Sequence, residues 1–260
     1  MKPEDLQYIL SMAGALPLLP VMAWQGKQVK SSVPKLAAAK GFSGLSPGAL
    51  GKLRLLVLGE STMAGLGVEW HQDGFAGGLA EQVAQIYGQE VHWEVVAKSG
   101  YTVREVNDRL LPGLPKGTFE LIVIGLGGND IFEFTPPWQW RAGCRQLIQG
   151  LRQHSPEAFI VFIQMPPVRF FPAFPRLIKW YAGLQADRLS TALQRTVKGW
   201  QRVFFISEPI TLQAWSARYG LEGGTSRFFS DGVHPSALTY RLWAKDTAAF
   251  LQGKLPPPAQ

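Results

Sequence analysis

The pattern of apolar and polar positions after residue 52 predicts strands that alternate with helices. Continuous apolar or β-rich runs, which suit buried strands, occupy residues 53–58, 91–96, 121–124, 159–163 and 203–206. Apolar positions at helical spacing occupy residues 75–87, 103–111, 138–152 and 236–251. Such alternation indicates βαβ units. We therefore expect an α/β fold whose parallel sheet is covered by helices on both faces.

The N-terminal segment has a different pattern. Residues 6–26 carry no charged side chain, and residues 6–24 are long enough to cross a hydrocarbon core of roughly 30 Å. Pro17 and Pro20 interrupt a regular helix there. Residues 1–30 are therefore interpreted as a single-pass membrane anchor or as an interfacial or packing helix. A cleaved signal peptide is a third interpretation, which Glu4 and Asp5 disfavour because a positive leading region is expected.

Composition sets the domain limits and the class of partner. Residues 31–51 are rich in Ser, Pro and Gly, which predicts a linker. We expect residues 52–252 to form a single folded domain and residues 253–260 to form a flexible tail. The chain has 26 Lys and Arg against 19 Asp and Glu, without a run of like charges, which disfavours a nucleic-acid partner and favours anionic lipid headgroups. Lysines at 27, 30, 35 and 40 follow the apolar segment. We therefore expect a membrane-associated protein with its folded domain in the cytoplasm, and a periplasmic domain as the alternative.

Candidate chemistry follows the predicted strands, because sites in such sheets form beyond the carboxyl ends of the strands. The four motifs there are Gly59-Glu60-Ser61, Lys98-Ser99-Gly100, Gly127-Gly128-Asn129-Asp130 and, before the last helix, Asp231-Gly232-Val233-His234. Each motif alone is equally typical of an ordinary turn or helix cap. Together they supply a serine nucleophile, a histidine base, an acid that orients it, and backbone and amide donors for an oxyanion. These parts fit acyl transfer from an ester.

These four blocks resemble the SGNH hydrolases, also called the GDSL esterase and lipase family, over roughly residues 53–251. The resemblance implies a flavodoxin-like three-layer α/β/α sandwich with a five-stranded parallel sheet. It also implies catalytic roles for Ser61, Asp231 and His234, and an oxyanion hole formed by Ser61, Gly100 and Asn129. It implies no metal and no cofactor. One departure is that Glu60 stands where the family has aspartate, so any role of that residue in bracing the turn is open.

Other sites are disfavoured by what the sequence lacks. Met63 stands where the nucleophile elbow of an α/β-hydrolase has its second glycine. His71, His92 and His154 lack the spacing of metal ligands and are interpreted as packing or surface residues. The single cysteine, Cys144, excludes an intrachain disulfide and is interpreted as a small buried side chain.

A proline- and aromatic-rich stretch, residues 165–181, follows the fourth predicted strand and is expected to overhang the serine. We expect Phe171 and Phe174, with Phe132 from the preceding motif, to form an acyl-binding wall, and Arg169 to lie near a phosphate or headgroup. Simple covering of the sheet by these aromatic rings is an equal alternative. The leading functional prediction is a serine esterase acting on lipid-like acyl esters, including lysophospholipids or acyl thioesters. The alternatives are a carbohydrate O-deacetylase and a non-catalytic membrane-tethered scaffold.

Overall fold

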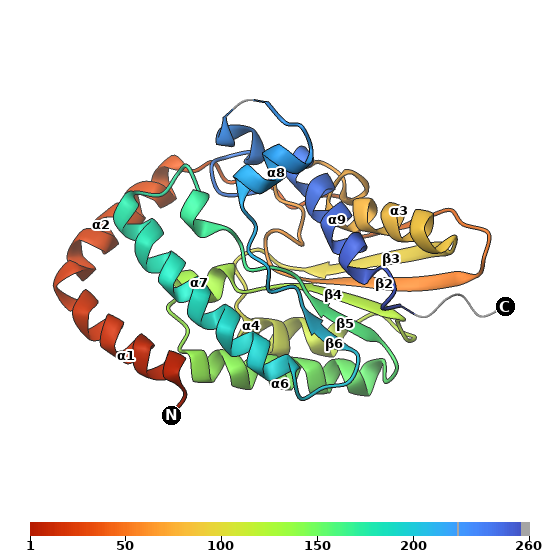
Figure 1. Ribbon diagram of the computed structural model, residues 1–260, viewed down its shortest axis with the longest axis horizontal. Helices are drawn as coiled ribbons and strands as arrows, with labels where there is room; N and C mark the ends of the chain where they lie inside the picture. Colours follow the sequence, from red (N-terminus) through yellow and green to blue (C-terminus); the bar gives the residue numbers. More distant parts are fainter. Residues whose placement is uncertain (223, 256–260) are drawn as a thin grey trace.

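Six strands form one sheet in the computed structural model, which describes residues 1–222 and 224–255. The strands are β1 (Ser43–Ser46), β2 (Lys52–Gly59), β3 (Glu90–Ala97), β4 (Leu121–Gly125), β5 (Phe159–Phe162) and β6 (Val203–Phe205). Their order is β1-β3-β2-β4-β5-β6 (Figure 1). The pairs from β3 to β6 are all parallel, which confirms the predicted five-stranded parallel sheet.

The sixth strand corrects the prediction that residues 31–51 are only a linker. Residues Ser43–Ser46 form β1, which pairs antiparallel with the edge strand β3. The sequence of β1 has little strand propensity, so its backbone pairing with β3 decides the conformation. Gly44 is required there by packing, because a Cβ atom at this position would lie 2.2 Å from the ring of Trp93. β1 thereby covers the edge of β3.

Helices cover both faces of the sheet, as the alternation predicted (Figure 1). One face packs against α3 (Phe75–Tyr87), α8 (Leu212–Arg218) and α9 (Ala237–Leu251). The other packs against α4 (Val103–Glu105), α6 (Pro137–His154) and α7 (Arg176–Val197). The helix predicted over 103–111 is irregular, since α4 continues as a π turn over Val106–Leu110 and a 3-10 turn over Leu111–Gly113. Short 3-10 turns also lie at His71–Asp73, Val168–Phe170 and Thr225–Phe228.

The C-terminal tail is only partly described. Leu255 is buried and packs with the core on the α3 and α9 side, so the described part of the predicted tail is attached to the domain. The remainder of that prediction, residues 256–260, lies outside the described residues.

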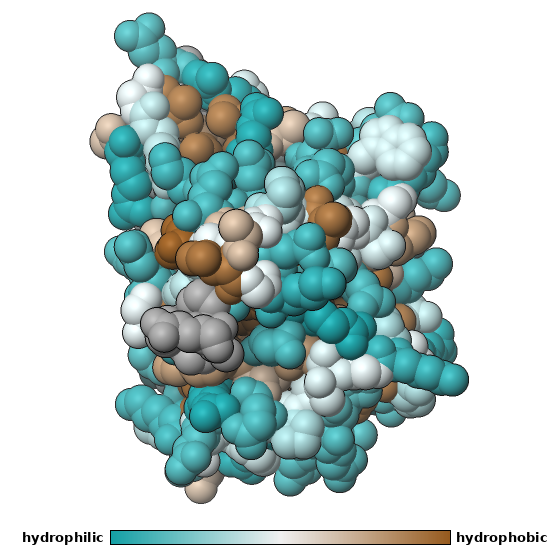
Figure 2. Space-filling view, turned by 90° about the vertical axis from the view of Figure 1, so that its right-hand side faces the viewer, coloured by the Kyte–Doolittle hydropathy of each residue, from teal (hydrophilic) through white to brown (hydrophobic). Residues whose placement is uncertain are grey.

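The apolar N-terminal segment forms two helices that lie outside the sandwich. α1 (Pro3–Ala15) and α2 (Leu19–Ser32) are joined by a 3-10 turn over Leu16–Leu18, near the two prolines. They form an arc along the outer side of α7, at the opposite end of the molecule from the C-terminus (Figure 1). By length and composition, residues 3–32 are apolar enough to cross a membrane. The face seen at the C-terminal end is mostly hydrophilic (Figure 2).

Buried ion pairs attach α1 to the domain. Glu4 and Asp5 are 2% and 5% exposed, and Arg141 of α6 donates to both at 2.9 and 2.7 Å. Arg195 of α7 donates to the other oxygen of Glu4 at 2.7 Å. The hydrogen bond from Arg141 lowers the pKa of Asp5. Because a buried carboxylate without a partner is costly, these contacts fix the first turn of α1 on the domain.

We predict that Arg141→Ala releases α1 from the domain. The substitution leaves two buried carboxylates without their shared partner, a loss of about 3–5 kcal/mol for a buried pair. Because α1 can detach without unfolding the sheet, amide hydrogen exchange of residues 3–15 should rise while that of β2 and β4 stays slow.

The matched control for this prediction is Arg145→Ala, one turn further along α6, whose side chain is exposed. It removes a similar side chain but should leave exchange in α1 unchanged. Equal exchange of α1 in Arg141→Ala and the unsubstituted protein would contradict the docking role of Arg141.

Candidate active site

The adjacent carboxyl ends of β2 and β4 bring two of the predicted motifs together. Gly59 is paired with Gly125 at the end of the ladder, and the next N–H, that of Glu60, donates to Gly125 O at 3.1 Å. A Cβ atom on Gly59 would lie 2.1 Å from the same oxygen, so the close approach requires glycine. The turn that carries Ser61 therefore lies beside the turn that carries Asn129.

The carboxylate of Glu60 bridges these two turns. It accepts the N–H of Gly128 at 2.5 Å and the N–H of Asn129 at 2.9 Å, and also bonds to the side-chain amide of Asn129. The same amide nitrogen donates to Tyr101 O at 3.2 Å. Asn129 is thus held between the residue before the serine and the residue after Gly100. The sequence left the role of Glu60 open, and in the structure its side chain bridges the turns that carry Ser61 and Asn129.

Burial affects the protonation of Glu60. The side chain is enclosed, and burial raises the pKa of Glu60 to about 8, although the Asn129 and Gly128 N–H groups favour the charged form. Asp130, the residue after Asn129, also has a buried carboxyl group, and burial raises its pKa to about 6. Asp130 accepts the N–H of Val103 at 3.0 Å, which ties the start of α4 to α5 (Gly128–Phe132), the short helix after β4 that also carries Asn129.

The Asp231-x-x-His234 turn forms an oriented acid and base. Nδ1 of His234 lies 2.7 Å from Oδ2 of Asp231, whose Oδ1 accepts the N–H groups of Val233 and His234 at 2.9 and 2.7 Å. Burial acts to raise the pKa of Asp231, but the hydrogen bonds from His234 and Val233 outweigh it and hold that pKa below its ordinary value. A carboxylate bonded to Nδ1 leaves Nε2 of His234 to act on a substrate.

The turn after Ser61 packs directly against the histidine turn. A Cβ atom on Gly67 would lie 2.4 Å from Pro235 O and 2.6 Å from Ser230 Oγ. Tyr240 also donates from its hydroxyl to Leu66 O at 2.8 Å. Within the part of the chain that the structure describes, no hydrogen bond joins Ser61 Oγ to His234. Such contacts often form only once a substrate is bound.

Gly100 leaves open space at the same edge of the sheet. It is exposed with a φ of 88°, and a Cβ atom there would meet nothing within 4 Å. Asn129 bonds to the carbonyl of the next residue, Tyr101, so the two predicted oxyanion donors belong to adjacent loops. The structure thus brings the loops of all five predicted catalytic and oxyanion residues to one edge.

An apolar cavity of about 680 Å³ adjoins this edge. Asn129 and His234 line it together with Phe132 and Phe174, whose ring centroids are 4.9 Å apart. Phe171 does not line this cavity. It is buried and packs against Phe174 and Phe229 at 5.7 and 5.5 Å.

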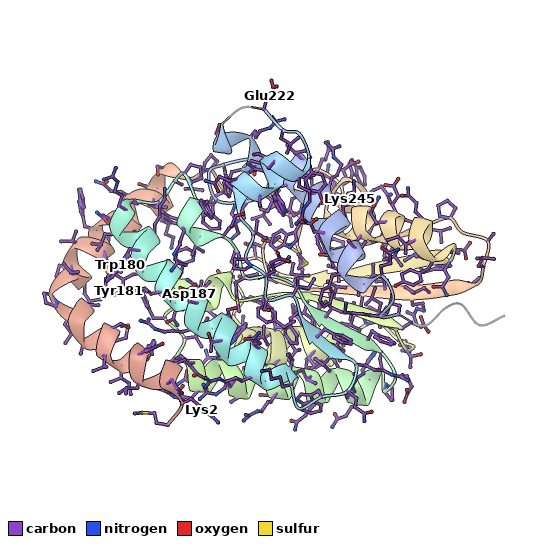
Figure 3. The ribbon with its side chains drawn as sticks, viewed as in Figure 1. Lys2, Trp180, Tyr181, Asp187, Glu222 and Lys245 are labelled. Atoms are coloured by element: carbon purple, nitrogen blue, oxygen red, sulfur yellow. The ribbon has the colours of Figure 1, made fainter. Side chains whose placement is uncertain are left out.

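Arg169 also lies away from that cavity. Its guanidinium bonds at 2.8 and 3.1 Å to Asp187 of α7, which is labelled in Figure 3. Both residues line a separate cavity of about 270 Å³. Arg169 thus bonds to Asp187 and does not line the cavity that contains His234, and its expected place near a phosphate or headgroup stays a prediction.

One wall of the 680 Å³ cavity comes from α2, which the sequence analysis did not assign to the site. Met22, Gly26, Val29 and Lys30 line it from one face of that helix. The signal in the sequence was the spacing of three and four residues between these positions, which is typical of one helical face. That spacing does not tell what the face contacts.

The remaining singled-out residues lie elsewhere. His71 is buried, and burial lowers its pKa to about 4, while Cys144 of α6 is buried in the core. His92 bonds to Glu90 at 2.7 Å and His154 to Pro115 O at 2.9 Å. Among the described residues, no group of three or more His, Cys, Asp or Glu side chains is placed to hold a metal ion.

A family comparison agrees with this geometry. Residues 57–242 match the GDSL-like Lipase/Acylhydrolase family. The chain belongs to this family. The match includes the Ser61 turn, the Asn129 loop and the Asp231–His234 turn, so the resemblance noted in the four motifs is confirmed.

One curated protein and several solved structures are similar to this chain. Esterase TesA of Pseudomonas aeruginosa is 28% identical over 185 residues, which are 70% of this chain and 79% of the esterase. A crystal structure of TesA has a TM-score of 0.58 at 22% identity and covers 78% of this chain and 99% of that one. A family two carbohydrate esterase from Clostridium thermocellum has a TM-score of 0.57 at 18% identity and covers 78% of this chain and 64% of that one. These structures share the fold.

A pH-dependent stability should follow from the buried Glu60. Its pKa is about 8 in the folded protein against an ordinary value of 4.5, so between these pH values only the folded chain keeps the proton. The contribution of Glu60 to the free energy of unfolding should therefore fall as pH rises from about 4.5 to about 8. Glu60→Gln should flatten this part of the profile, although it costs about 1–3 kcal/mol by placing an amide against N–H donors. Urea unfolding at pH 5.5 and 8.5 measures both effects.

Asp130 sets the control for that measurement. Burial also raises its pKa, so Asp130→Asn should remove the dependence of the unfolding free energy between about pH 3.8 and 6 and leave the part between 6 and 8. The same slope between pH 6 and 8 in Glu60→Gln and the unsubstituted protein would rule out Glu60 as its source.

Proposed function

We propose that the protein is a serine esterase that hydrolyses lipid-like acyl esters through an acyl-enzyme on Ser61. The observation that carries the proposal is His234, which is bonded to Asp231 and lines an apolar cavity together with Asn129. Family membership supports ester hydrolysis as the reaction. The cavity supports an aliphatic acyl group, because its lining is mainly apolar.

The mechanism uses this chain's residues in the following order. Nε2 of His234 removes the hydroxyl proton of Ser61 as its Oγ attacks the acyl carbonyl, while Asp231 stabilises the imidazolium. The N–H groups of Ser61 and Gly100 and the amide of Asn129 donate to the oxyanion. His234 then protonates the leaving alcohol or thiol, and water activated by the same histidine releases the acid.

The bridge from Glu60 bears on the oxyanion step. Both hydrogens of the Asn129 amide have acceptors, Glu60 and Tyr101 O, in the substrate-free protein. To donate to the oxyanion, the amide must give up one of these two hydrogen bonds. The bond to Tyr101 O, at 3.2 Å, is the weaker of the two and is the one we expect to break. The other N–H of the amide still donates to Glu60, so the amide stays oriented.

The carbohydrate O-deacetylase remains the second candidate. It is supported by the carbohydrate esterase of the same fold. The apolar wall of phenylalanines at the cavity favours the lipid ester, since a glycan needs polar partners for its hydroxyls. A non-catalytic scaffold would not need the oriented acid and base at this edge.

We further propose that the protein lies on a membrane surface through α1 and α2. Their outward side chains include large apolar residues that are at least 44% exposed: Leu6, Ile9, Leu10, Leu16, Val21 and Trp24. Lys27 follows three residues after Trp24 on the same helix, so an anionic leaflet fits this face. Anionic lipids are abundant on the cytoplasmic leaflet, which supports a cytoplasmic domain over the periplasmic alternative.

Hydrolysis of p-nitrophenyl esters from acetate to palmitate tests the activity. The purified protein should prefer medium or long chains, and Ser61→Ala should lower kcat by about 10⁴-fold or more. Asn129→Ala should lower kcat by about 10²–10³-fold, because it removes one oxyanion donor. Ser99→Ala is the matched control, because it changes the other serine at a strand end. Turnover that survives Ser61→Ala would overturn the assignment, and activity limited to acetate would favour the deacetylase.

Binding to lipid vesicles tests the membrane surface. Leu10→Ser and Trp24→Ser should each lower the affinity for phosphatidylcholine vesicles containing phosphatidylglycerol by about tenfold, as measured by co-sedimentation. Each substitution removes a large apolar side chain from the lipid-facing side. Trp70→Ser is the control, since Trp70 is 48% exposed but lies outside α1 and α2. Equal binding by all variants would contradict a role of this face.

A further inference from the structure

The cavity beside the catalytic histidine is closed on one side by the N-terminal segment. Of its lining residues, Met22, Gly26 and Val29 belong to α2, whereas Phe132, Phe174 and His234 belong to the sandwich. A wall from the first 33 residues is not needed to complete the catalytic groups. It does decide the length and width of the apolar space that those groups face.

The wall is one continuous face of α2. Met22, Gly26 and Val29 are spaced by four and three residues, so they lie on one side of the helix. Met22 and Val29 are buried, whereas Val21 and Trp24 on the same helix are 44% and 59% exposed. α2 therefore has separate inner and outer apolar faces, and the inner one lines the cavity.

Several contacts hold this wall in place. Met22 packs with Ala15 and Tyr181, which projects from α7 toward α1 and α2 (Figure 3). The hydroxyl of Tyr8 donates to Phe134 O at 2.7 Å, next to the loop that carries Asn129. Glu4 and Asp5 add the buried ion pairs described above. These contacts hold α1 and the first turns of α2 against the domain.

A glycine in the middle of the wall leaves room for a ligand. Gly26 lines the cavity, and a Cβ atom added there would meet nothing within 4 Å. A glycine inside a helix costs stability relative to alanine, so local helix propensity does not explain it. An unfilled apolar face opposite Phe132 and Phe174 suits a flexible aliphatic chain.

We propose that α2 forms one wall of the acyl-binding site, so that the N-terminal segment is part of the active site. The ligand class is the single aliphatic chain of a medium- or long-chain ester or thioester, lying between α2 and the Phe132 and Phe174 rings. The proposal rests on the esterase function proposed above. Each methylene that enters this space should raise kcat/KM about fourfold until the space is filled.

Filling the wall at Gly26 tests the proposal. Gly26→Phe should lower the ratio of kcat/KM for p-nitrophenyl laurate to that for p-nitrophenyl acetate by at least about tenfold, since a laurate chain loses several buried methylenes. The matched control is Gly14→Phe in α1. Gly14 is exposed, a Cβ atom there also meets nothing within 4 Å, and it does not line the cavity.

The expected result is a lowered ratio in Gly26→Phe and an unchanged ratio in Gly14→Phe, with melting temperatures recorded for both. The same ratio in both variants would overturn the proposal while leaving the esterase assignment intact. Ala23→Phe, which fills the neighbouring part of the wall, is the second variant if Gly26→Phe does not fold.

Calorimetric binding of lauric acid separates this proposal from the esterase function. Lauric acid is the product acid and binds without turnover, so its affinity should fall at least about tenfold in Gly26→Phe and not in Gly14→Phe. If the unsubstituted protein hydrolyses no ester but Gly26→Phe still lowers the affinity for lauric acid, the acyl site would be supported and the esterase function would be contradicted. Unchanged affinity in Gly26→Phe would overturn the acyl site whatever the activity.

Discussion

The buried carboxylate of Glu60 joins the turn that carries Ser61 to the loop that carries Asn129, and the rest of the site depends on this bridge. It becomes possible because β2 and β4 are adjacent and end in register at Gly59 and Gly125. The N–H groups of Gly128 and Asn129 then point at one carboxyl group. The two turns that carry Ser61 and Asn129, which come from distant parts of the chain, are thereby held at a fixed separation.

The bridge uses a group that is expensive to bury. Burial raises the pKa of Glu60 to about 8, and only donors on the neighbouring loop oppose that shift. Glu4 and Asp5 repeat the pattern on the outside of the sandwich, where Arg141 and Arg195 supply the partners. In both places, carboxylates that would be costly alone specify which segments meet. One set positions the chemistry, and the other positions the helices that close the cavity.

The N-terminal segment therefore acts in two environments. Its outer face exposes apolar side chains suited to lipid, and its inner face lines the cavity that contains His234 and Asn129. This arrangement places one helix between the apolar cavity and a side of the molecule that exposes apolar side chains.

The sequence by itself determined the parallel sheet and the four motifs at its edge. Apolar runs mark the strands locally, and the parallel rule places their carboxyl ends together, so the motifs of Ser61, Gly100 and Asn129 were predicted to meet. The predicted roles of these residues, and of Asp231 and His234 before the last helix, came from the resemblance of the four motifs to the family. The tertiary structure decided what lies around them. Phe174 lines the cavity whereas Phe171 is buried and Arg169 pairs with Asp187, although all three belong to one loop.

The same limit applied to Glu60, α2 and β1. Their spacing or composition was visible in the sequence, but their partners were not: Asn129 for Glu60, the cavity for α2 and the edge of β3 for β1. The physical reason is that a strand or a turn is specified by neighbours along the chain. A buried charge, a helix face or an edge strand is stabilised by groups far away in sequence, which only the folded chain brings within reach.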